Sequence, residues 1–190
     1  MRIIAGSARG RKLATPPRHK GLRPTGDRVR EAIFGILSSR WELAGVEVLD
    51  LFAGTGALGC EALSRGARSV VFVEQSASTA RLIRENLRRI GQPDQQIVCG
   101  EVIDALAGFR ARRFDIVFLD PPYADHKVAQ IVLALDRSEV LCHGATVVAE
   151  HGRDEPLPPP EALGALKHQT TRTYGDTCVT LWELPEEESP

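Results

Sequence analysis

Short apolar runs alternate with amphipathic segments through the middle of the chain. The apolar runs are rich in Val, Ile, Leu and Phe, which is typical of buried strands. The segments between them repeat apolar residues every three or four positions, as helices do. Strands that alternate with helices in this way predict a mostly parallel sheet with helices on both faces. The expected strands are 46–52, 69–74, 95–100, 114–120 and 145–151, and the expected helices are 56–66, 76–91, 102–108 and 126–136.

The N-terminal part of the chain departs from this alternation. Residues 2–13 predict two short strands around a glycine-bearing turn, and 14–24 form a proline-rich connector. Thr25 is placed to cap a helix that follows. Arg28 and Arg30 fall outside the apolar stripe of that helix. The stripe consists of Val29, Ile33, Ile36 and Leu37.

The C-terminal part also departs from the alternation. Two strand-like segments, 167–174 and 177–184, flank a Gly-Asp pair, which predicts an antiparallel hairpin at one edge of the sheet. Residues 185–190 form an acidic tail. We therefore expect three parts: a hairpin and connector at 1–24, a main domain at 25–184, and the tail.

Composition places the chain among ordinary globular proteins. Its 190 residues suit one main domain with a small appendage. The four cysteines form no CxxC pair, so we expect neither a zinc site nor any other metal centre. No signal-peptide pattern opens the chain, and no apolar run is long enough to cross a bilayer. We therefore expect a soluble, cytoplasmic protein without a membrane partner.

Charge is divided unevenly along the chain. Residues 1–40 hold ten Lys and Arg residues against two acidic ones, a local charge of +8, whereas the chain as a whole carries −1. Such a split indicates that the N-terminal part faces a polyanion. The alternative is a solvated basic arm without a partner.

A glycine-rich loop follows the first strand of the alternating region. Gly54, Gly56 and Gly59 form a GxGxxG pattern between a predicted strand and a predicted helix, which indicates a nucleotide-type ligand. Glu74 ends the next strand, where a carboxylate suits the two hydroxyls of a ribose. That position fits NAD and S-adenosylmethionine equally well. Asp50 favours S-adenosylmethionine, because a carboxylate can bind its ammonium group but would repel a pyrophosphate.

Further along, Glu101 follows the third strand. It is placed to accept from an adenine N6 amine, with Val102 against the ring. An acid that simply favours the N-terminus of the next helix explains Glu101 equally well. A row of arginines in the helix at 76–91 is expected to be a solvated face.

The fourth strand ends in the tetrapeptide Asp120-Pro121-Pro122-Tyr123. Ligands of open α/β sheets bind at the carboxyl ends of the strands, so this tetrapeptide should face the same crevice as the glycine loop. The Asp120 carboxylate and the Pro121 carbonyl can accept from the two N–H groups of an exocyclic amine and localise its lone pair. The prolines fix φ, and Tyr123 offers a face for a base to stack on, worth ~1–3 kcal/mol. The pattern predicts methyl transfer to a base nitrogen, catalysed by positioning.

These motifs resemble those of S-adenosylmethionine-dependent amino-methyltransferases. The stretches "RIIAGSARGRKL", "LRPTGDRVREAIFGIL" and "YGDTCVTLWEL" are similar to the RsmD family in particular, and the similarity covers nearly the whole chain. Gly35, where relatives often carry Asn, is a small departure that touches no expected catalytic role. The resemblance implies a Rossmann-like class I methyltransferase fold: a mostly parallel seven-stranded sheet, a C-terminal antiparallel hairpin and a small N-terminal β-hairpin extension.

The resemblance also implies a reaction and a set of site residues. Family members methylate the N2 amine of one guanine, number 966 of bacterial 16S ribosomal RNA, within a protein-bound or partly assembled small subunit. We expect the chain to act as a monomer. The expected catalytic residues are Asp120, Pro121, Pro122 and Tyr123. The expected cofactor-binding residues are Arg23, Pro24, Thr25, Asp50, Phe52, Gly54, Thr55, Gly56, Glu74, Gln75, Glu101 and Val102. The expected RNA-binding residues are Arg9, Arg11, Lys12, Arg23, Arg28 and Arg30.

Three other functions fit parts of the pattern. A DNA adenine-N6 methyltransferase shares the DPPY motif, but usually carries a target-recognition insert that is missing between Tyr123 and the fifth strand. A nicotinamide-dependent oxidoreductase shares GxGxxG, but leaves Asp50 and DPPY without a role. An RNA-binding module without activity would have no need for the acceptor tetrapeptide.

Overall fold

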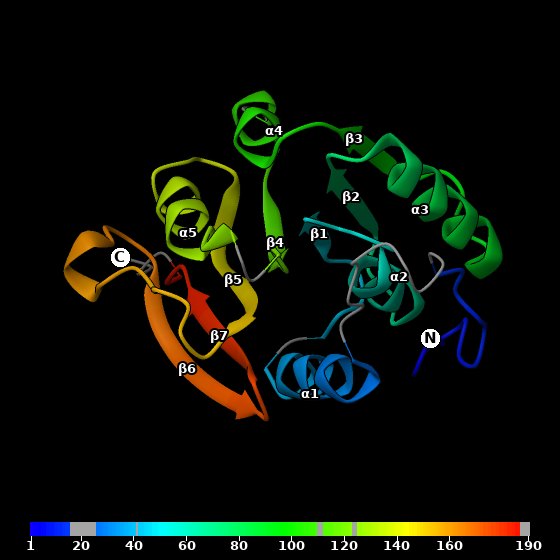
Figure 1. The fold of residues 1–190 in the computed structure, drawn as a ribbon, viewed down its shortest axis with the longest axis horizontal. Helices are drawn as coiled ribbons and strands as arrows, with labels where there is room; N and C mark the ends of the chain where they lie inside the picture. Colours follow the sequence, from blue (N-terminus) through cyan, green and yellow to red (C-terminus); the bar gives the residue numbers. More distant parts are fainter. Residues whose placement is uncertain (16–25, 41, 110–111, 123–124, 187–190) are drawn as a thin grey trace.

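The fold is a seven-stranded sheet between two layers of helices (Figure 1). The computed structural model describes residues 1–15, 26–40, 42–109, 112–122 and 125–186. The strand order is β3-β2-β1-β4-β5-β7-β6, parallel except for the two antiparallel pairs that β7 makes with β5 and β6. The expected fold class is confirmed. The strands are β1 (Glu47–Leu51), β2 (Ser69–Glu74), β3 (Gln96–Cys99), β4 (Phe114–Leu119), β5 (Leu141–Gly152), β6 (Lys167–Tyr174) and β7 (Thr177–Glu183).

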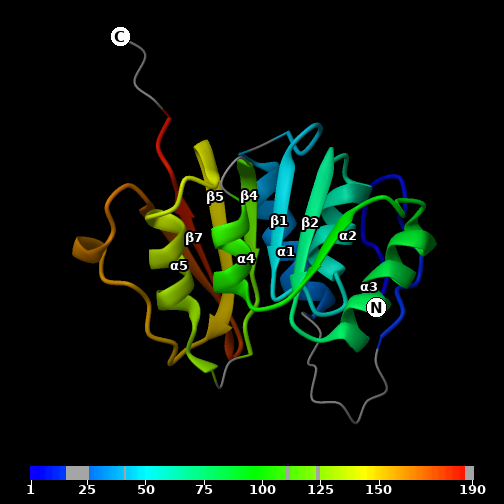
Figure 2. The same cartoon turned by 90° about the horizontal axis from the view of Figure 1, so that it is seen from above.

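The helices divide between the two faces of the sheet. Apolar side chains of α1, α2 and α3 pack on one face, and those of α4 and α5 pack on the other, so that the strands lie between the two layers (Figure 2). Alternate residues of a strand face opposite layers: Val48 belongs to the first cluster, whereas Leu49 and Leu51 belong to the second. The helices are α1 (Asp27–Ser38), α2 (Ala57–Ser64), α3 (Ala77–Ile90), α4 (Val102–Gly108) and α5 (Val128–Asp136), with a short 3₁₀ turn η2 (Pro160–Ala162).

The chain reverses its winding direction between β1 and β4. From β1 it moves outward to β2 and β3, and then returns to β4 on the other side of β1. Helices therefore leave the carboxyl ends of β1 and β4 on opposite faces, which opens a crevice at this edge. The glycine loop and the Asp120 tetrapeptide both begin here, as their positions in the sequence predict.

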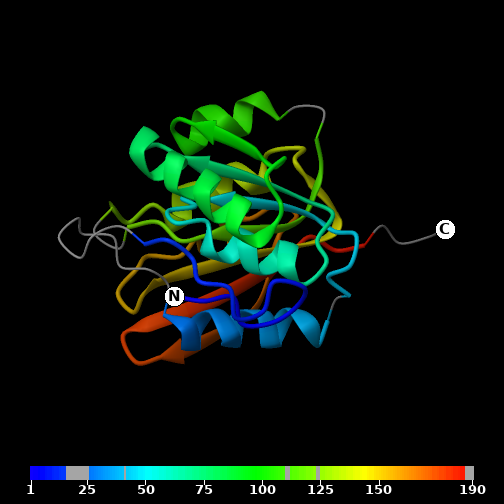
Figure 3. The same ribbon diagram turned by 90° about the vertical axis from the view of Figure 1, so that its right-hand side faces the viewer.

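The N-terminal segment, residues 1–15, packs against the main body instead of projecting from it. One isolated antiparallel bridge, Arg2 with Lys12, stands in place of the two expected strands. Ile3, Ala8 and Leu13 are buried in the same cluster as α1 and α2, and Figure 3 shows the segment beside these helices. Backbone hydrogen bonds such as the one from the N–H of Ile3 to the carbonyl of Arg11 join the two arms of the segment, and burial of these three side chains in the shared core holds it against the main body.

Hydrogen bonds from α2 and α3 fix the course of this segment. The Glu61 carboxylate accepts from the backbone N–H groups of Ile4 at 2.8 Å and Ala5 at 3.0 Å. The Asn86 side chain accepts from the N–H of Ala14 and donates to its carbonyl. Peptide groups that would otherwise be left unpaired near the core are therefore satisfied by side chains of the helices.

The C-terminal hairpin forms as predicted, with β6 and β7 joined at Gly175 and Asp176. Gly175 has φ +67°, the left-handed conformation that tight hairpin turns need. Thr25, the expected helix cap, lies outside the described residues, and Gly26 occupies the N-cap position of α1. Among the described residues, no helix combines the length and the apolar character that a membrane crossing requires.

Candidate active site

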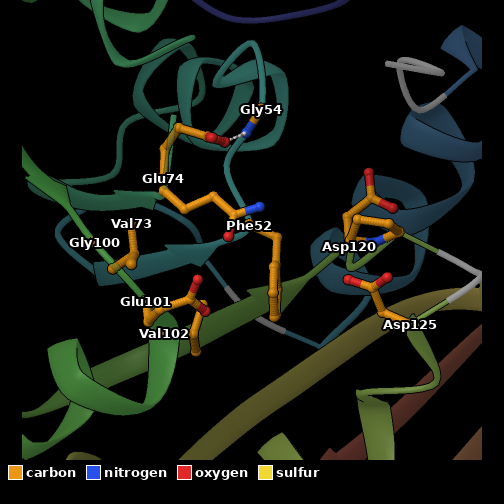
Figure 4. A pocket seen from close by; sticks show the side chains of 11 residues that line it. Phe52, Gly54, Val73, Glu74, Gly100, Glu101, Val102, Asp120 and Asp125 are labelled. Atoms are coloured by element: carbon orange, nitrogen blue, oxygen red, sulfur yellow. Dashed lines mark hydrogen bonds between the residues drawn. The ribbon is translucent and has the colours of Figure 1, made fainter. Parts of the chain in front are cut away.

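A pocket lies at the carboxyl ends of β1, β2, β3 and β4 (Figure 4). It has about 520 Å³ of empty space, part of it open to solvent. Glu74 and Glu101 lie on one side of it, Asp120 and Asp125 on the other, and the ring of Phe52 stands between them (Figure 4). The lining residues are Phe52, Gly54, Val73, Glu74, Gln75, Gly100, Glu101, Val102, Asp120, Pro122 and Asp125.

The glycine loop between β1 and α2 forms one wall of the pocket. Its backbone turns sharply, since Phe52, Gly54 and Gly56 all have positive φ, at 59°, 54° and 72°. For Phe52 this conformation is unusual, and it presents the ring to the pocket. A Cβ atom at Gly59 would come within 2.3 Å of the Phe72 ring, so only glycine allows α2 to lie this close to β2. Thr55, an expected cofactor residue, is buried and does not line the pocket.

Asp50 supports the loop from behind. Its carboxylate is 1% exposed, does not line the pocket, and accepts a 2.9 Å hydrogen bond from the N–H of Gly59. Burial raises the pKa of Asp50 well above its usual value, against the effect of the Gly59 N–H, and the charges of Asp120 and Glu74 raise it further. The side chain lies on the α2 face of the sheet, as Val48 does, and supports the loop from there. Hydrogen bonding to a ligand ammonium, directly or through water, stays a prediction.

Glu74 joins the end of β2 to the glycine loop. Its carboxylate accepts from the N–H of Gly54 at 2.9 Å and from the N–H of Ser76 at 2.8 Å, and one edge remains on the pocket. The Gly54 N–H is therefore directed at a carboxylate, whereas a dinucleotide site would offer it to phosphate oxygens. Gln75 follows and also lines the pocket.

Glu101 occupies the N-cap position of α4, yet its side chain makes no capping hydrogen bond. The side chain is exposed and lines the pocket beside the buried Val102. Both interpretations from the sequence therefore describe real features: the residue starts a helix, and its carboxylate faces the space where a ligand would lie.

Asp120 and Pro122 of the acceptor tetrapeptide, together with Asp125, form the opposite wall. Asp120 is half-buried directly after β4, Pro121 is buried, and Pro122 is exposed and lines the pocket. The N–H of Asp125 donates to the carbonyl of Pro122 at 3.0 Å, which closes a turn. Tyr123 lies outside the described residues, as do Arg23, Pro24 and Thr25.

Sequence reasoning missed three residues of the pocket: Val73, Gly100 and Asp125. Val73 and Gly100 directly precede the expected residues Glu74 and Glu101, so the strand ends already located them. Asp125 lies two residues past the acceptor tetrapeptide, and only the turn onto Pro122 shows that it returns to the site.

The pocket is strongly acidic. Four of its lining residues are carboxylic acids, and none of the described lining residues is Lys or Arg. Such a site favours a cationic ligand with hydroxyl and amine donors, and disfavours a pyrophosphate. Phe52, Val73 and Val102 add an apolar surface on which a flat ring can lie.

Two of the expected RNA-binding residues, Arg11 and Lys12, lie beside the last turn of α3, at the end of that helix away from the pocket. Arg9, Arg11 and Lys12 are exposed, and Arg11 donates to the carbonyl of Arg89 in the last turn of α3. A 14-residue helix is about 20 Å long, so Arg11 and Lys12 stand roughly that far from the pocket end of α3. Arg28, on α1, is also exposed.

Arg30 does not have the position expected of an RNA-binding residue. Its side chain is fully buried, donates to the carbonyl of Arg2 and to the carboxylate of Asp27, and lies 3.7 Å from the buried carboxylate of Glu61. The guanidinium thus binds α1 to α2 and to the N-terminal segment. The prediction of an RNA contact is wrong for this residue, because its charge is taken up inside the protein.

Comparison with known proteins gives one consistent family. The family described as "Conserved hypothetical protein 95" matches residues 1–183. Ribosomal RNA small subunit methyltransferase D of Haemophilus influenzae is 39% identical over 90% of this chain and 89% of its own. The protein of the same name from Escherichia coli is 34% identical over 96% of this chain and 89% of its own.

Solved structures agree with the sequence comparison. A Thermus thermophilus protein described as hypothetical superposes with a TM-score of 0.81 at 34% identity, over 98% of this chain and 99% of its own. Full-length coverage in both directions means that the fold and the order of its elements are shared from end to end. The chain therefore belongs to the conserved hypothetical protein 95 family, the family of the ribosomal RNA small subunit methyltransferase D proteins.

Proposed function

We propose that this chain transfers a methyl group from S-adenosylmethionine to the exocyclic N2 amine of a guanine in 16S ribosomal RNA, at position 966. The observation that carries the proposal is the arrangement of the pocket: an acidic cofactor wall faces an Asp-Pro-Pro acceptor wall across one crevice. Membership of a family of ribosomal RNA small subunit methyltransferases supports RNA as the substrate class. The substrate is a protein-bound or partly assembled small subunit, and the chain acts on it as a monomer.

The described residues fit the cofactor, S-adenosylmethionine. Glu74 would accept from the ribose hydroxyls, and Glu101 from the adenine N6 amine. Phe52 and Val102 would cover the faces of the adenine ring. When bound, the cofactor supplies a methyl group on a positively charged sulfur, and the acids among the described lining residues stabilise that charge.

The acceptor wall suits a weak nitrogen nucleophile. An exocyclic amine delocalises its lone pair into the ring, so two acceptors on its N–H groups are needed to direct the lone pair outward. Asp120 supplies a carboxylate and Pro121 a main-chain carbonyl whose direction the two proline rings restrict. Tyr123 would hold the base by stacking. These groups position the amine, so no strong general base is required.

The acidic pocket weighs against a nicotinamide-dependent oxidoreductase. Four carboxylates among the lining residues would repel a pyrophosphate, and the Gly54 N–H that would bind one is directed at Glu74. DNA adenine methylation keeps the same acceptor chemistry, and the relatives named for ribosomal RNA weigh against it.

One assay tests the proposal directly. Small subunits from cells lacking this modification are incubated with the protein and with cofactor labelled on its methyl group, and the RNA is digested to nucleosides. We expect label in N2-methylguanosine, located by primer extension at one guanine. Label in another nucleoside, or label in DNA adenine alone, would refute the guanine-N2 assignment. An Asp120→Ala protein that retains cofactor binding is the matched negative control.

A further inference from the structure

Glu155 lies outside the pocket, on the loop that follows β5, and it is almost completely buried, with a side chain 3% exposed. A buried carboxylate is costly unless its oxygens are satisfied. Both oxygens of Glu155 bind the segment that leaves the acceptor loop: Oε2 lies 2.9 Å from Nδ1 of His126, and Oε1 accepts from the N–H of Val128 at 3.0 Å. This segment is the exit of the loop that carries Asp120 and Asp125.

The contact with Val128 replaces a missing helix cap. Val128 is the first residue of α5, and Lys127 at the N-cap position makes no side-chain capping bond. The first N–H groups of a helix need an acceptor, and a carboxylate there also interacts favourably with the helix dipole. Glu155 supplies that acceptor from a loop 27 residues further along the chain.

The contact with His126 fixes an unusual backbone conformation. His126 has φ +47°, in the left-handed region, where it directly follows the pocket residue Asp125. Such a conformation is maintained only when the surroundings hold it. The hydrogen bond to Glu155 holds His126 in this conformation. The hydrogen bond from Asp125 to Pro122 connects His126 with the acceptor wall, so the position of that wall also depends on Glu155.

We infer that Glu155 is a positioning residue for methyl transfer: through His126 and Val128 it holds the exit of the acceptor loop, and thereby places the wall formed by Asp120, Pro122 and Asp125. The inference rests on the proposed function, because its kinetic test measures methyl transfer. The cofactor wall is built on β1, β2 and β3 and makes no contact with Glu155 among those described. Loss of Glu155 therefore acts on the acceptor side and leaves cofactor binding intact.

The test compares Glu155→Ala with Glu155→Gln, and with Glu161→Gln as the matched control. Glu161 is an exposed acid on the same loop. Misplacement of a reacting group by about 1 Å can cost about 100-fold in rate. We expect Glu155→Ala to lower kcat roughly 10- to 100-fold, with cofactor affinity within about twofold of the wild type. Gln retains an oxygen for the Val128 N–H and an amide for His126, so Glu155→Gln should recover most of the activity. The control should behave as wild type.

A second pair of variants applies if Glu155→Ala does not fold. The His126 side chain is more than half exposed, so His126→Ala removes one of the two bonds without opening the core. His126→Asn, which keeps a donor and tolerates positive φ, should restore the loss. Unchanged kcat in folded Glu155→Ala and His126→Ala proteins would overturn the inference, as would a parallel loss of cofactor affinity. If the wild-type protein is itself inactive, the proposed function is refuted, and amide hydrogen exchange then tests the role of Glu155. Exchange across residues 120–128 should be faster in Glu155→Ala than in wild type, and equal exchange rates would overturn the inference.

Discussion

The carboxylate of Asp50 reaches from β1 to the first turn of α2, where it accepts a 2.9 Å hydrogen bond from the N–H of Gly59. This bond ties the strand to the helix across the loop that forms one wall of the pocket. It also places an ionisable group, 1% exposed, beside two further acids of the site, Glu74 and Asp120. The charge state of Asp50 is therefore linked both to folding and to the pocket.

The first prediction concerns pH and Asp50. Burial raises the pKa of Asp50 in the folded protein above 3.8, so the unfolded chain loses this proton first as the pH rises. The contribution of Asp50 to the free energy of unfolding is then fully present below pH 3.8 and is lost as the pH rises from there through the folded-state pKa. Asp50→Asn should remove this fall, while its amide oxygen can still accept from Gly59. Urea unfolding from pH 4 to pH 8 should show the variant gaining stability relative to wild type.

The stabilising contribution of Asp136 depends on pH in the opposite direction to that of Asp50. Burial raises the pKa of Asp136, but backbone N–H groups of Leu166, Gly164 and Ala165, and the charge of Lys167, outweigh it and lower the pKa. Its stabilising contribution is present at neutral pH and is lost as the pH falls through the lowered pKa. Asp136→Asn should therefore cost stability at pH 7 and little near pH 3. Two variants with the same pH profile would contradict the assignment.

The second prediction separates catalysis from cofactor binding. Asp120→Ala removes the acceptor carboxylate and leaves Glu74, Glu101 and Phe52 of the cofactor wall in place. We expect methyl transfer to fall by at least about 100-fold, the usual effect of removing one group that stabilises developing charge. Titration calorimetry with S-adenosylhomocysteine should give an affinity within a few-fold of wild type. A variant that loses the cofactor as well would show that Asp120 belongs to the cofactor wall.

The third prediction uses two glycines of helices. A Cβ at Gly59 in α2 would meet the Phe72 ring at 2.3 Å and 2.7 Å, so Gly59→Ala forces the packing apart and should cost about 1–3 kcal/mol. A Cβ at Gly35 in α1 meets nothing within 4 Å, so Gly35→Ala should stabilise the protein by about 0.5–1 kcal/mol through helix propensity. Thermal unfolding of the two variants should shift in opposite directions. Shifts of equal sign would mean that close packing of α2 on β2 is not the constraint.

The fourth prediction concerns Glu61, which is fully buried and accepts from the backbone of Ile4 and Ala5 as well as from Arg65. Glu61→Ala would remove the only one of the two carboxylates near Arg30 that is buried and leave the exposed Asp27, which should cost about 3–5 kcal/mol. Trypsin should then cleave the released N-terminal segment faster. Glu85→Ala, which breaks an exposed ion pair on α3, is the control and should cost less than about 1 kcal/mol.

The pattern of the sequence predicts the sheet and most of the pocket, because the signals for both lie in short stretches of neighbouring residues. Strand ends, glycine turns and the DPP sequence are encoded in neighbouring residues, and parallel strands bring their carboxyl ends together. Glu74, Glu101 and Asp120 meet in the pocket on that basis alone. The alternation of β1 likewise places Asp50 on the same face of the sheet as Val48, so its position behind the glycine loop follows from the strand pattern.

Contacts between distant parts of the chain could not be predicted in the same way. Arg30 resembles a surface residue in its own helix, and its burial depends on Glu61, 31 positions later, and on the carbonyl of Arg2. Glu155 similarly resembles an acid in a solvated loop until the fold brings it to Val128. Both cases are buried charges whose partners come from other elements, and such pairs leave no periodic trace in the sequence.

The last prediction tests how far the RNA extends over the protein. Arg9, Arg11 and Lys12 are exposed, and Arg11 and Lys12 lie beside the end of α3, about 20 Å from the pocket by the length of that helix. If RNA contacts both places, replacing all three with Gln should weaken binding and reduce the salt dependence. Each lost phosphate contact lowers the slope of log K against log salt by about 0.7–0.9. We therefore expect the slope to fall by about 2, with cofactor affinity unchanged.

Arg113→Gln serves as the control for this charge change, because Arg113 is exposed and pairs with Glu139, away from the N-terminal segment. It should leave the salt slope within about 0.3 of wild type, since it removes no phosphate contact. An unchanged slope in the triple variant would confine the RNA to the surface around the pocket. Arg28 on α1 would then be the next residue to replace, because it is exposed and directly follows Asp27 at the start of that helix.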